Sequence, residues 1–276
     1  MGAPSPEATL VRFGRLLPAV CLSLLVVPAP RLGAEPPPLP AEPDPLAAIH
    51  DEAAALAPQV AAPESVGESL ERVESLLSGL VGMVDVAAAS PGELALLDEL
   101  LALRFTALTT TVPLPEGSRG VFLAQVAPGA MRSDVVMGVP ASITLAQAII
   151  ESGWGKTAPG YNLFGMKGEG SAGSTSHVGI EYRHGKRVHR RSSFRSYGSF
   201  AESIEDHARL LSTRSRYAEA RAVSEDPAAF ARALQGKYAT DPKYAAKLMD
   251  ISDRYGLDRF DWSMPTPPAV AEVDEP

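Results

Sequence analysis

The sequence predicts an α+β fold: a mainly helical domain with a small β-hairpin, preceded by an acidic helical segment. Apolar residues recur at helical spacing through much of residues 46–109 and 119–260. One alternating stretch, residues 178–183, is typical of a strand. The charge also divides the chain, because residues 35–118 hold 2 basic and 14 acidic residues and residues 119–260 hold 20 and 14. These observations favour two regions of different character.

Residues 1–34 have the order of a secretory signal peptide. Arg12 and Arg15 precede an apolar run at residues 16–27, and small residues surround Ala34. A helix that crosses a bilayer needs about 20 apolar residues, and this run is shorter. The sequence therefore predicts cleavage near Ala34 and export to the periplasm or the cell exterior, with a membrane contact only through the signal peptide.

The single cysteine, Cys21, lies within this apolar run. If the signal is cleaved, the mature chain forms no disulfide and binds no metal through a thiolate. The alternative is the acylated cysteine of a lipoprotein. We prefer the cleaved signal, because Val20 is larger than the small residue usual before a lipidated cysteine and the apolar run continues past Cys21.

A proline-rich stretch at residues 35–45 is typical of an extended linker and precedes the acidic helical segment, residues 46–109. Three amphipathic helices are expected in this segment, and they suggest a hairpin or small bundle. They cover residues 46–60, 64–84 and 91–108. Nothing in these helices indicates a catalytic site. The segment is therefore expected to bind a protein partner, which the sequence does not identify. Prolines and a glycine at residues 109–118 mark the boundary.

The second region, residues 119–260, is expected to begin with two short helices, residues 121–126 and 131–137, separated by Pro128 and Gly129. A third helix follows Pro140 and ends near Ser152. Its side chains leave almost no polar face, which predicts a buried helix that stops at Gly153.

The rest of this region is expected to be helical after the hairpin. Ser199 with Glu202 predicts a capping box, and Asp226-Pro227 and Asp241-Pro242 each place an N-cap before a proline. Gly236 and Gly256 are likewise expected to end helices. Residues 261–276, rich in proline and acid, are predicted to be a disordered tail.

Glu151 is the first candidate catalytic residue, because it is the one ionisable residue of the apolar helix and lies at its end. Desolvation and the negative end of the helix dipole both raise the pKa of a carboxyl in this place. A carboxyl that stays protonated near neutrality can protonate a departing sugar oxygen. The alternative is a glutamate that only hydrogen-bonds the following glycine turn. Trp154, between two glycines, favours the catalytic interpretation by placing an indole beside the carboxyl.

Glu181 is the second candidate carboxylate. It lies on the hairpin face opposite Ile180 and Tyr182, and glycosidases of both stereochemical classes use two acids. The alternative is an ordinary salt bridge to a neighbouring basic residue of the hairpin.

Other site classes have weaker support. The basic run from Arg183 to Arg195 has few interleaved aromatics, so it favours a solvated or wall-facing strand pair over a nucleic-acid site. The glycines at residues 168–173 precede a strand and do not join a strand to a helix, which excludes a dinucleotide fingerprint. The five histidines show no metal-ligand spacing.

Five motifs follow one another within about residues 119–258. They are FLAQ at 122–125, LAQAIIESGWG at 145–155, NLFGMKG at 162–168, the hairpin with EY at 181–182 and FRSY at 194–197, and YATDP at 238–242. With these motifs in this order, the sequence resembles the glucosaminidase family of peptidoglycan hydrolases, glycoside hydrolase family 73, which includes flagellar hydrolases and autolysins. Met166 stands where isoleucine is frequent, a change that conserves volume. The acidic segment does not resemble a flagellar rod-binding portion, which weakens a flagellar role.

The resemblance implies a lysozyme-like domain that hydrolyses β-1,4 bonds of peptidoglycan glycan strands as an endo-β-N-acetylglucosaminidase, with no cofactor, no metal and no amidase activity. It implies catalytic roles for Glu151 as general acid, Glu181 as second carboxylate and Tyr238 near the substrate or catalytic water. It also implies that Trp154, Asn162 and Phe164 bind substrate.

Two alternatives stay open. A lytic transglycosylase or muramidase of lysozyme-like fold also places a glutamate at a helix end, but often manages without a second one. A non-catalytic peptidoglycan-binding scaffold is disfavoured because Glu151 and Glu181 are both present.

Overall fold

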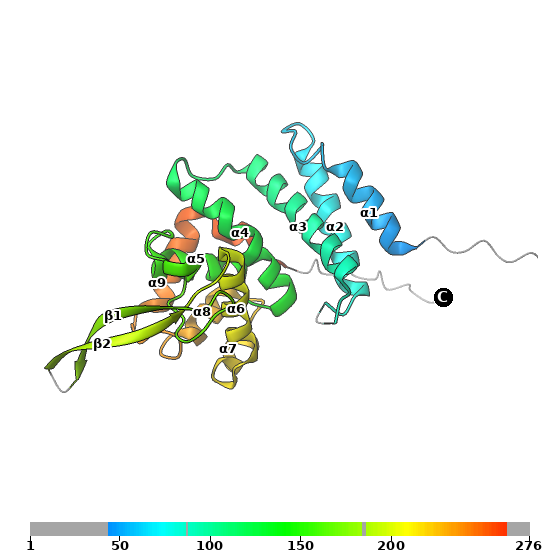
Figure 1. Ribbon diagram of the computed structural model, residues 1–276. Helices are drawn as coiled ribbons and strands as arrows, with labels where there is room; N and C mark the ends of the chain where they lie inside the picture. Colours follow the sequence, from blue (N-terminus) through cyan, green and yellow to red (C-terminus); the bar gives the residue numbers. More distant parts are fainter. Residues whose placement is uncertain (1–43, 87, 184–185, 264–276) are drawn as a thin grey trace, which may run out of the picture. The chain divides into compact units, whose positions relative to one another are not determined.

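The computed structural model of the chain describes the backbone of residues 44–86, 88–183 and 186–263, with side chains except at residues 177–191 (Figure 1). The predicted signal peptide with Cys21, nearly all of the predicted linker, and the predicted tail from residue 264 onward lie outside the described residues. The described residues belong to one compact unit. This unit is mainly helical with one small antiparallel sheet, as the sequence predicts.

The acidic segment folds into the three expected helices, α1 (Pro45–Leu56), α2 (Val66–Met83) and α3 (Pro91–Thr111). Leu77 of α2 and Leu100 of α3 are fully buried, and α2 packs along α3 (Figure 1). A capping box begins α3, because Ser90 Oγ accepts from the Glu93 N–H and the Glu93 carboxylate accepts from the Ser90 N–H. Helical periodicity was therefore a sufficient guide to this segment.

The second region is built around α5 (Ala141–Ser152), whose residues are buried along nearly its whole length. Helices α4, α8 and α9 all pack against α5. The elements that follow the hairpin are α6 (Phe200–Thr213), η2 (Ser215–Tyr217), α7 (Ala218–Arg221), α8 (Pro227–Leu234), α9 (Tyr244–Tyr255) and η3 (Leu257–Phe260), and η1 (Pro159–Tyr161) precedes it. The predicted buried helix is thus confirmed, and it ends at Gly153, which has a left-handed backbone (φ 57°).

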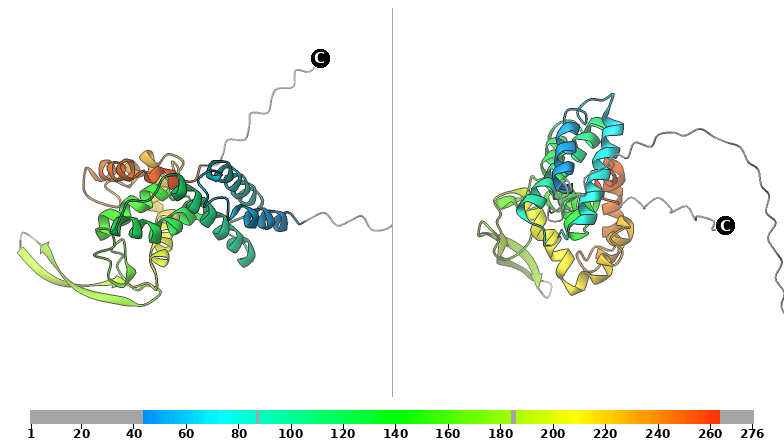
Figure 2. Two further views of the ribbon diagram at one scale, coloured as in Figure 1. Left: turned by 90° about the horizontal axis from the view of Figure 1, so that it is seen from above. Right: turned by 90° about the vertical axis from the view of Figure 1, so that its right-hand side faces the viewer.

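Strands β1 (Ser174–Arg183) and β2 (Lys186–Arg195) form the predicted hairpin. They pair antiparallel from Ser174 with Arg195 to Arg183 with Lys186. Residues 184–185, which connect the two strands, lie outside the described residues. Figure 2 shows the two strands as a long pair of ribbons that extends beyond the helices.

The prediction of two short helices at residues 121–137 is wrong, because α4 (Ser118–Met137) is continuous through Pro128. A proline inside a helix removes the hydrogen bond to the carbonyl four residues earlier, here Ala124. Ala124 and Pro128 are both exposed, so water can bind that carbonyl. Gly129 lets α6 approach closely, since a Cβ there would lie 3.3 Å from Ile204 Cδ1. Packing against α6 therefore keeps the helix intact.

The prediction that Asp241 caps a helix beginning at Pro242 is also wrong, because α9 begins at Tyr244. Asp241 Oδ1 accepts from the Lys243 N–H at 2.9 Å, so the aspartate closes a turn before the helix. The other predicted cap is confirmed, since Asp226 Oδ1 accepts from the Ala229 N–H at 2.9 Å and Pro227 opens α8.

The predicted tail begins too early, because Asp261 and Trp262 are held by the folded region. Asp261 Oδ1 accepts from the Ser142 N–H at 2.6 Å, and the Trp262 N–H donates to Asp134 Oδ2 at 2.8 Å. Arg104 of α3 donates to the carbonyls of Phe260 at 3.2 Å and Asp261 at 2.9 Å. Buried hydrogen bonds of Arg104 thus cross the boundary that the sequence suggests between the acidic segment and residues 119–260.

Candidate active site

Glu151 lies in the last turn of α5, where the buried helix reaches the surface. The neighbouring Ser152 is fully buried; its hydroxyl donates to the Ala148 carbonyl and accepts from the Gly155 N–H at 2.7 Å. These bonds fix the backbone on both sides of the helix end. As a result, the side chain of Glu151 projects from a defined position at the end of α5, where the helix dipole is negative.

The carboxyl of Glu151 is held by a chain of buried donors. Tyr244 Oη donates to Glu151 Oε1 at 3.1 Å, and Gln147 Nε2 donates to Tyr244 Oη at 3.0 Å. Gln147 is fully buried and Tyr244 is 3% exposed. Glu151 is exposed as a residue, but partial burial of its carboxyl raises its pKa, and the hydrogen bond from Tyr244 lowers that pKa by less. The protonated form of this carboxyl is therefore favoured over that of a glutamate in water.

Tyr238 lies beside this pair. Its ring is nearly parallel to that of Tyr244, with 5.9 Å between the ring centroids. Burial raises the pKa of Tyr238, and the charges of Tyr244 and Glu151 raise it further. Tyr238 therefore keeps its phenolic proton as a possible donor. The structure brings Glu151 and Tyr238, two of the predicted catalytic residues, to one site.

Phe164 lies one layer behind Tyr238. Its ring stacks on His207 with 3.8 Å between centroids, and His207 contacts Tyr238 edge to face at 5.6 Å. His207 is fully buried, and burial lowers its pKa to about 3, so the imidazole is neutral at every ordinary pH. This apolar stack supports the ring of Tyr238 from behind.

Asn162 organises the loop after η1. Its Nδ2 donates to the carbonyls of Met166 and Arg195, both at 2.9 Å, and its Oδ1 accepts from the Met166 N–H at 3.0 Å. Asn162 is 3% exposed. The residue joins the loop to the end of β2, and its part in substrate binding stays a prediction.

Trp154 lies in a separate aromatic cluster. It contacts Tyr255 edge to face at 4.8 Å and Phe122 at 5.9 Å, and the guanidinium of Arg119 lies 5.3 Å from its ring centroid. Its backbone is left-handed (φ 65°), which is uncommon outside glycine. These contacts are packing contacts, and among the described residues none joins the indole to Glu151.

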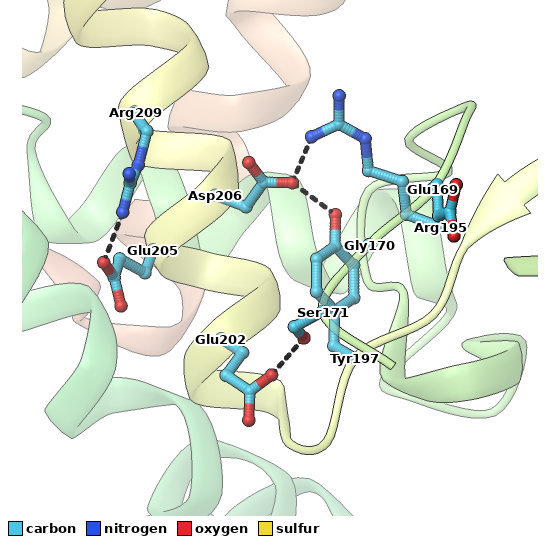
Figure 3. Close-up of a pocket in the computed structure, with 9 residues that line it drawn as sticks. All are labelled: Glu169, Gly170, Ser171, Arg195, Tyr197, Glu202, Glu205, Asp206 and Arg209. Carbon is cyan, nitrogen blue, oxygen red and sulfur yellow. Dashed lines mark hydrogen bonds and ion pairs between the residues drawn. The ribbon is translucent and has the colours of Figure 1, made fainter. Parts of the chain in front are cut away.

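Glu181 is on β1, paired in register with Val188 of β2. Its side chain lies outside the described residues. The base of the hairpin is anchored to α6, because Tyr197 Oη donates to Asp206 Oδ2 at 2.7 Å and Arg195 forms an ion pair with the same carboxylate (Figure 3). The strand that carries Glu181 is thus tied to the helical region at one end.

This anchor lines a pocket of about 260 Å³ between α6 and the hairpin base. Figure 3 shows that most of its charged side chains already have partners: Glu202 pairs with Ser171, and Glu205 with Arg209. None of the predicted catalytic or substrate-binding residues lines this pocket. It is therefore distinct from the Glu151 site.

Within the described part of the chain, no three His, Cys, Asp or Glu side chains lie close enough together to hold a metal ion. Among the helices described, none is long and apolar enough to cross a membrane.

Three residues around the candidate site, Gln147, Tyr244 and His207, were not predicted from the sequence. Gln147 had a usable signal, because a polar residue four positions before Glu151 shares its face of an otherwise apolar helix. Tyr244 had none, since it is 93 residues from Glu151 and only the packing of α9 against α5 brings it near.

Residues 127–257 match the glucosaminidase family, described as mannosyl-glycoprotein endo-beta-N-acetylglucosaminidase. The chain is 37% identical over 167 residues to an autolysin of Enterococcus faecalis, which covers 56% of this chain and 23% of the relative. It is 40% identical over 154 residues to a probable N-acetylmuramidase of Lactococcus lactis, covering 52% of this chain and 35% of that protein. The chain thus spans between about a quarter and a third of these two relatives.

One solved structure supports the fold directly. The catalytic domain of the autolysin Auto from Listeria monocytogenes superposes with a TM-score of 0.50 at 31% sequence identity, over 55% of this chain and 93% of that domain. The matched region contains α5, the hairpin and α9, which carry the residues of the candidate site. Through residues 127–257, the chain belongs to the glucosaminidase family.

Proposed function

We propose that this protein is an endo-β-N-acetylglucosaminidase that hydrolyses β-1,4 glycosidic bonds of peptidoglycan, with Glu151 as its general acid. The observation that carries the proposal is the carboxyl at the end of the buried α5, held by Tyr244 and raised in pKa by burial. Family membership and relatives named as autolysins support the substrate class.

The hydrogen bond assigns different roles to the two oxygens of Glu151. Oε1 accepts from Tyr244, so the acidic proton resides on Oε2 and is given to the departing sugar oxygen. The carboxylate that remains is a stronger acceptor than the neutral acid, and the bond from Tyr244 therefore strengthens as the proton leaves. Positioned acid catalysis of this kind contributes roughly 10²- to 10⁴-fold.

Glu181 supplies the second carboxylate from the hairpin, and Tyr238 orients the substrate or the water. Family resemblance and the position of Glu181 on β1 support the first role. The second is supported by the position of Tyr238 beside Tyr244 and Glu151. Trp154, Asn162 and Phe164 contribute to substrate binding. Asn162 acts indirectly, by holding the loop after η1 against the end of β2.

We assign the chain to the outside of the cytoplasm. A signal peptide at residues 1–34 with cleavage near Ala34 accounts for export, and relatives named for cell-wall lysis agree with it. The catalytic domain corresponds to residues 119–260. Its surplus of 20 basic over 14 acidic residues suits an anionic wall polymer.

The sugar at the new reducing end tests the proposal. Purified peptidoglycan is digested with the protein, and the products are reduced and identified by mass spectrometry. We expect fragments that end in reducing N-acetylglucosamine. Reducing N-acetylmuramic acid, or its anhydro form, would instead assign a muramidase or lytic transglycosylase, an alternative favoured by the relative named a probable N-acetylmuramidase.

The variant Glu151→Gln separates catalysis from binding. It keeps the side-chain volume and a polar group but has no acidic proton. We expect it to lose lysis of purified walls while still sedimenting with them. Full lysis by this variant would exclude Glu151 as the acid, and loss of lysis accompanied by loss of folding would be recognised by circular dichroism.

A further inference from the structure

A groove of about 350 Å³ lies along α9, next to Ile150 of α5. Its charged lining consists of three cations, Lys243, Lys247 and Arg254, and one carboxylate, that of Asp250. Its apolar lining comes from Ile150 of α5 and from Ile251 of α9. None of the predicted catalytic or substrate-binding residues belongs to it, so it is a surface that the proposed reaction does not explain.

Two residues of the groove are chain neighbours of the candidate active site. Ile150 directly precedes Glu151, and Lys243 directly precedes Tyr244, which donates to Glu151. From Lys243 to Arg254 the chain advances eleven residues, about 16 Å at 1.5 Å per residue. An extended peptide of five residues also spans about 16 Å. The groove therefore has the length of a short peptide and is formed next to the residues that hold the carboxyl of Glu151.

The lining of the groove holds three cations and one carboxylate, that of Asp250, so positive charge is in excess. Lys247 pairs with Asp241, and Arg254 pairs with Asp250 at 2.8 Å one helical turn away. The charge of Lys243 also acts on the carboxylate of Asp241. Both paired cations are more than half exposed, so they can exchange their partners for a ligand carboxylate at small cost. Cations above an apolar floor suit a ligand that carries carboxylates and small apolar groups together.

We propose that this groove binds the short peptide that branches from the glycan strand next to the bond cleaved at Glu151. The inference rests on the proposed function, and it adds that the enzyme prefers peptide-bearing strands. The peptides of peptidoglycan are short, rich in alanine and carry free carboxylates. Their carboxylates pair with Lys243 and Arg254, and their methyl groups lie on Ile150 and Ile251.

The test compares two substrates made from one preparation: glycan strands that bear peptides, and the same strands after an amidase has removed the peptides. The double variant Lys243→Glu, Arg254→Glu reverses two charges of the groove. The control is Arg209→Glu on α6, because Arg209 forms a similarly exposed ion pair with Glu205 one helical turn away. All proteins are assayed as the full mature chain.

For the unaltered enzyme we expect a higher kcat/KM on peptide-bearing strands. The double variant is expected to lower the ratio of kcat/KM between peptide-bearing and peptide-free strands by about tenfold, since each exposed pair contributes a few-fold. The control should keep the ratio, and Lys243→Gln, Arg254→Gln should lower it less than the glutamate variant does.

Two results would overturn the inference: an unchanged ratio in the double variant, or a parallel loss on both substrates. If the double variant keeps its ratio but no longer binds an anionic secondary wall polymer, the groove serves that polymer and not the peptide. If the unaltered enzyme cleaves neither substrate, the proposed function itself fails. These outcomes keep the two proposals distinguishable.

Discussion

Replacing Tyr244 with phenylalanine removes one hydroxyl and tests the geometry around Glu151. The variant loses the 3.1 Å bond to Glu151 Oε1 and leaves Gln147 Nε2 without its 3.0 Å acceptor in a fully buried place. A hydrogen bond to a charged group contributes about 1.5–3 kcal/mol. Because this bond stabilises the carboxylate left after proton transfer, we expect kcat to fall by about 10- to 100-fold.

The pH dependence of the rate shows in which direction the pKa of Glu151 moves when this hydrogen bond is lost. The bond from Tyr244 lowers the pKa of Glu151 against the raising effect of burial, so its loss raises that pKa further. A general acid must be protonated to act, and its deprotonation sets the alkaline limb of the rate profile. That limb is therefore expected to move to higher pH in Tyr244→Phe, measured as kcat against pH on purified peptidoglycan.

Two further variants separate this effect from misfolding. Tyr255→Phe removes a hydroxyl that no described hydrogen bond joins to Glu151, and it should keep both rate and pH profile. Adding Gln147→Leu to Tyr244→Phe removes the unpaired amide, so we expect part of the lost thermal stability to return without the activity. An unshifted alkaline limb with a normal rate in Tyr244→Phe would refute the proposed role of this hydrogen bond.

Three predictions concern stability. Burial raises the pKa of Asp134 to about 7 from an ordinary 3.8. Between these values the folded state holds a proton that the unfolded state releases, so the free energy of unfolding falls by up to about 4 kcal/mol as the pH rises from 4 to 7. Thermal melts of Asp134→Asn should show a smaller fall over this pH range, and an identical pH dependence would contradict this cause. Arg104→Ala leaves buried carbonyls and Glu74 without a donor, and it should lower the free energy of unfolding by about 3 kcal/mol. For the same reason, a fragment of residues 119–260 should melt at a lower temperature than one of residues 44–263. Equal melting temperatures of the two fragments would show that the contacts of Arg104 contribute little. Asn162→Ala removes three hydrogen bonds, which together contribute about 3 kcal/mol to stability. We therefore expect faster amide hydrogen exchange at residues 162–168. Unchanged protection of these amides would show that other contacts hold the loop.

The helices and the position of Glu151 could be predicted because both depend on local signals. An apolar run, a single carboxylate at its end and a following Gly153 are adjacent in sequence, and α5 has the expected bounds. The start of α9 could not be placed correctly, because Asp241-Pro242 is equally compatible with a capped turn and a helix start. The continuity of α4 through Pro128 depends on contacts with α6, which lie about 70 residues further along the chain.

The partners of Glu151 could be predicted only in part. Tyr238 belongs to a sequence motif, whereas Tyr244 and His207 reach the site through the packing of α9 and α6. Asn162 was expected to bind substrate, whereas its three hydrogen bonds to the backbone depend on how the loop packs against β2 and could not be predicted. Local pattern was enough to select Glu151 as the candidate acid, whereas packing decides which residues surround it.

The most direct test of the account is the pKa of Glu151 itself. Carboxyl carbons of glutamate are followed by nuclear magnetic resonance from pH 3 to 9 in the labelled protein, and Glu151→Gln identifies the signal. We expect Glu151 to titrate above the ordinary range of glutamate, because burial outweighs the hydrogen bond from Tyr244. A midpoint at or below that range would mean that the carboxyl is ionised at working pH and would contradict its role as general acid.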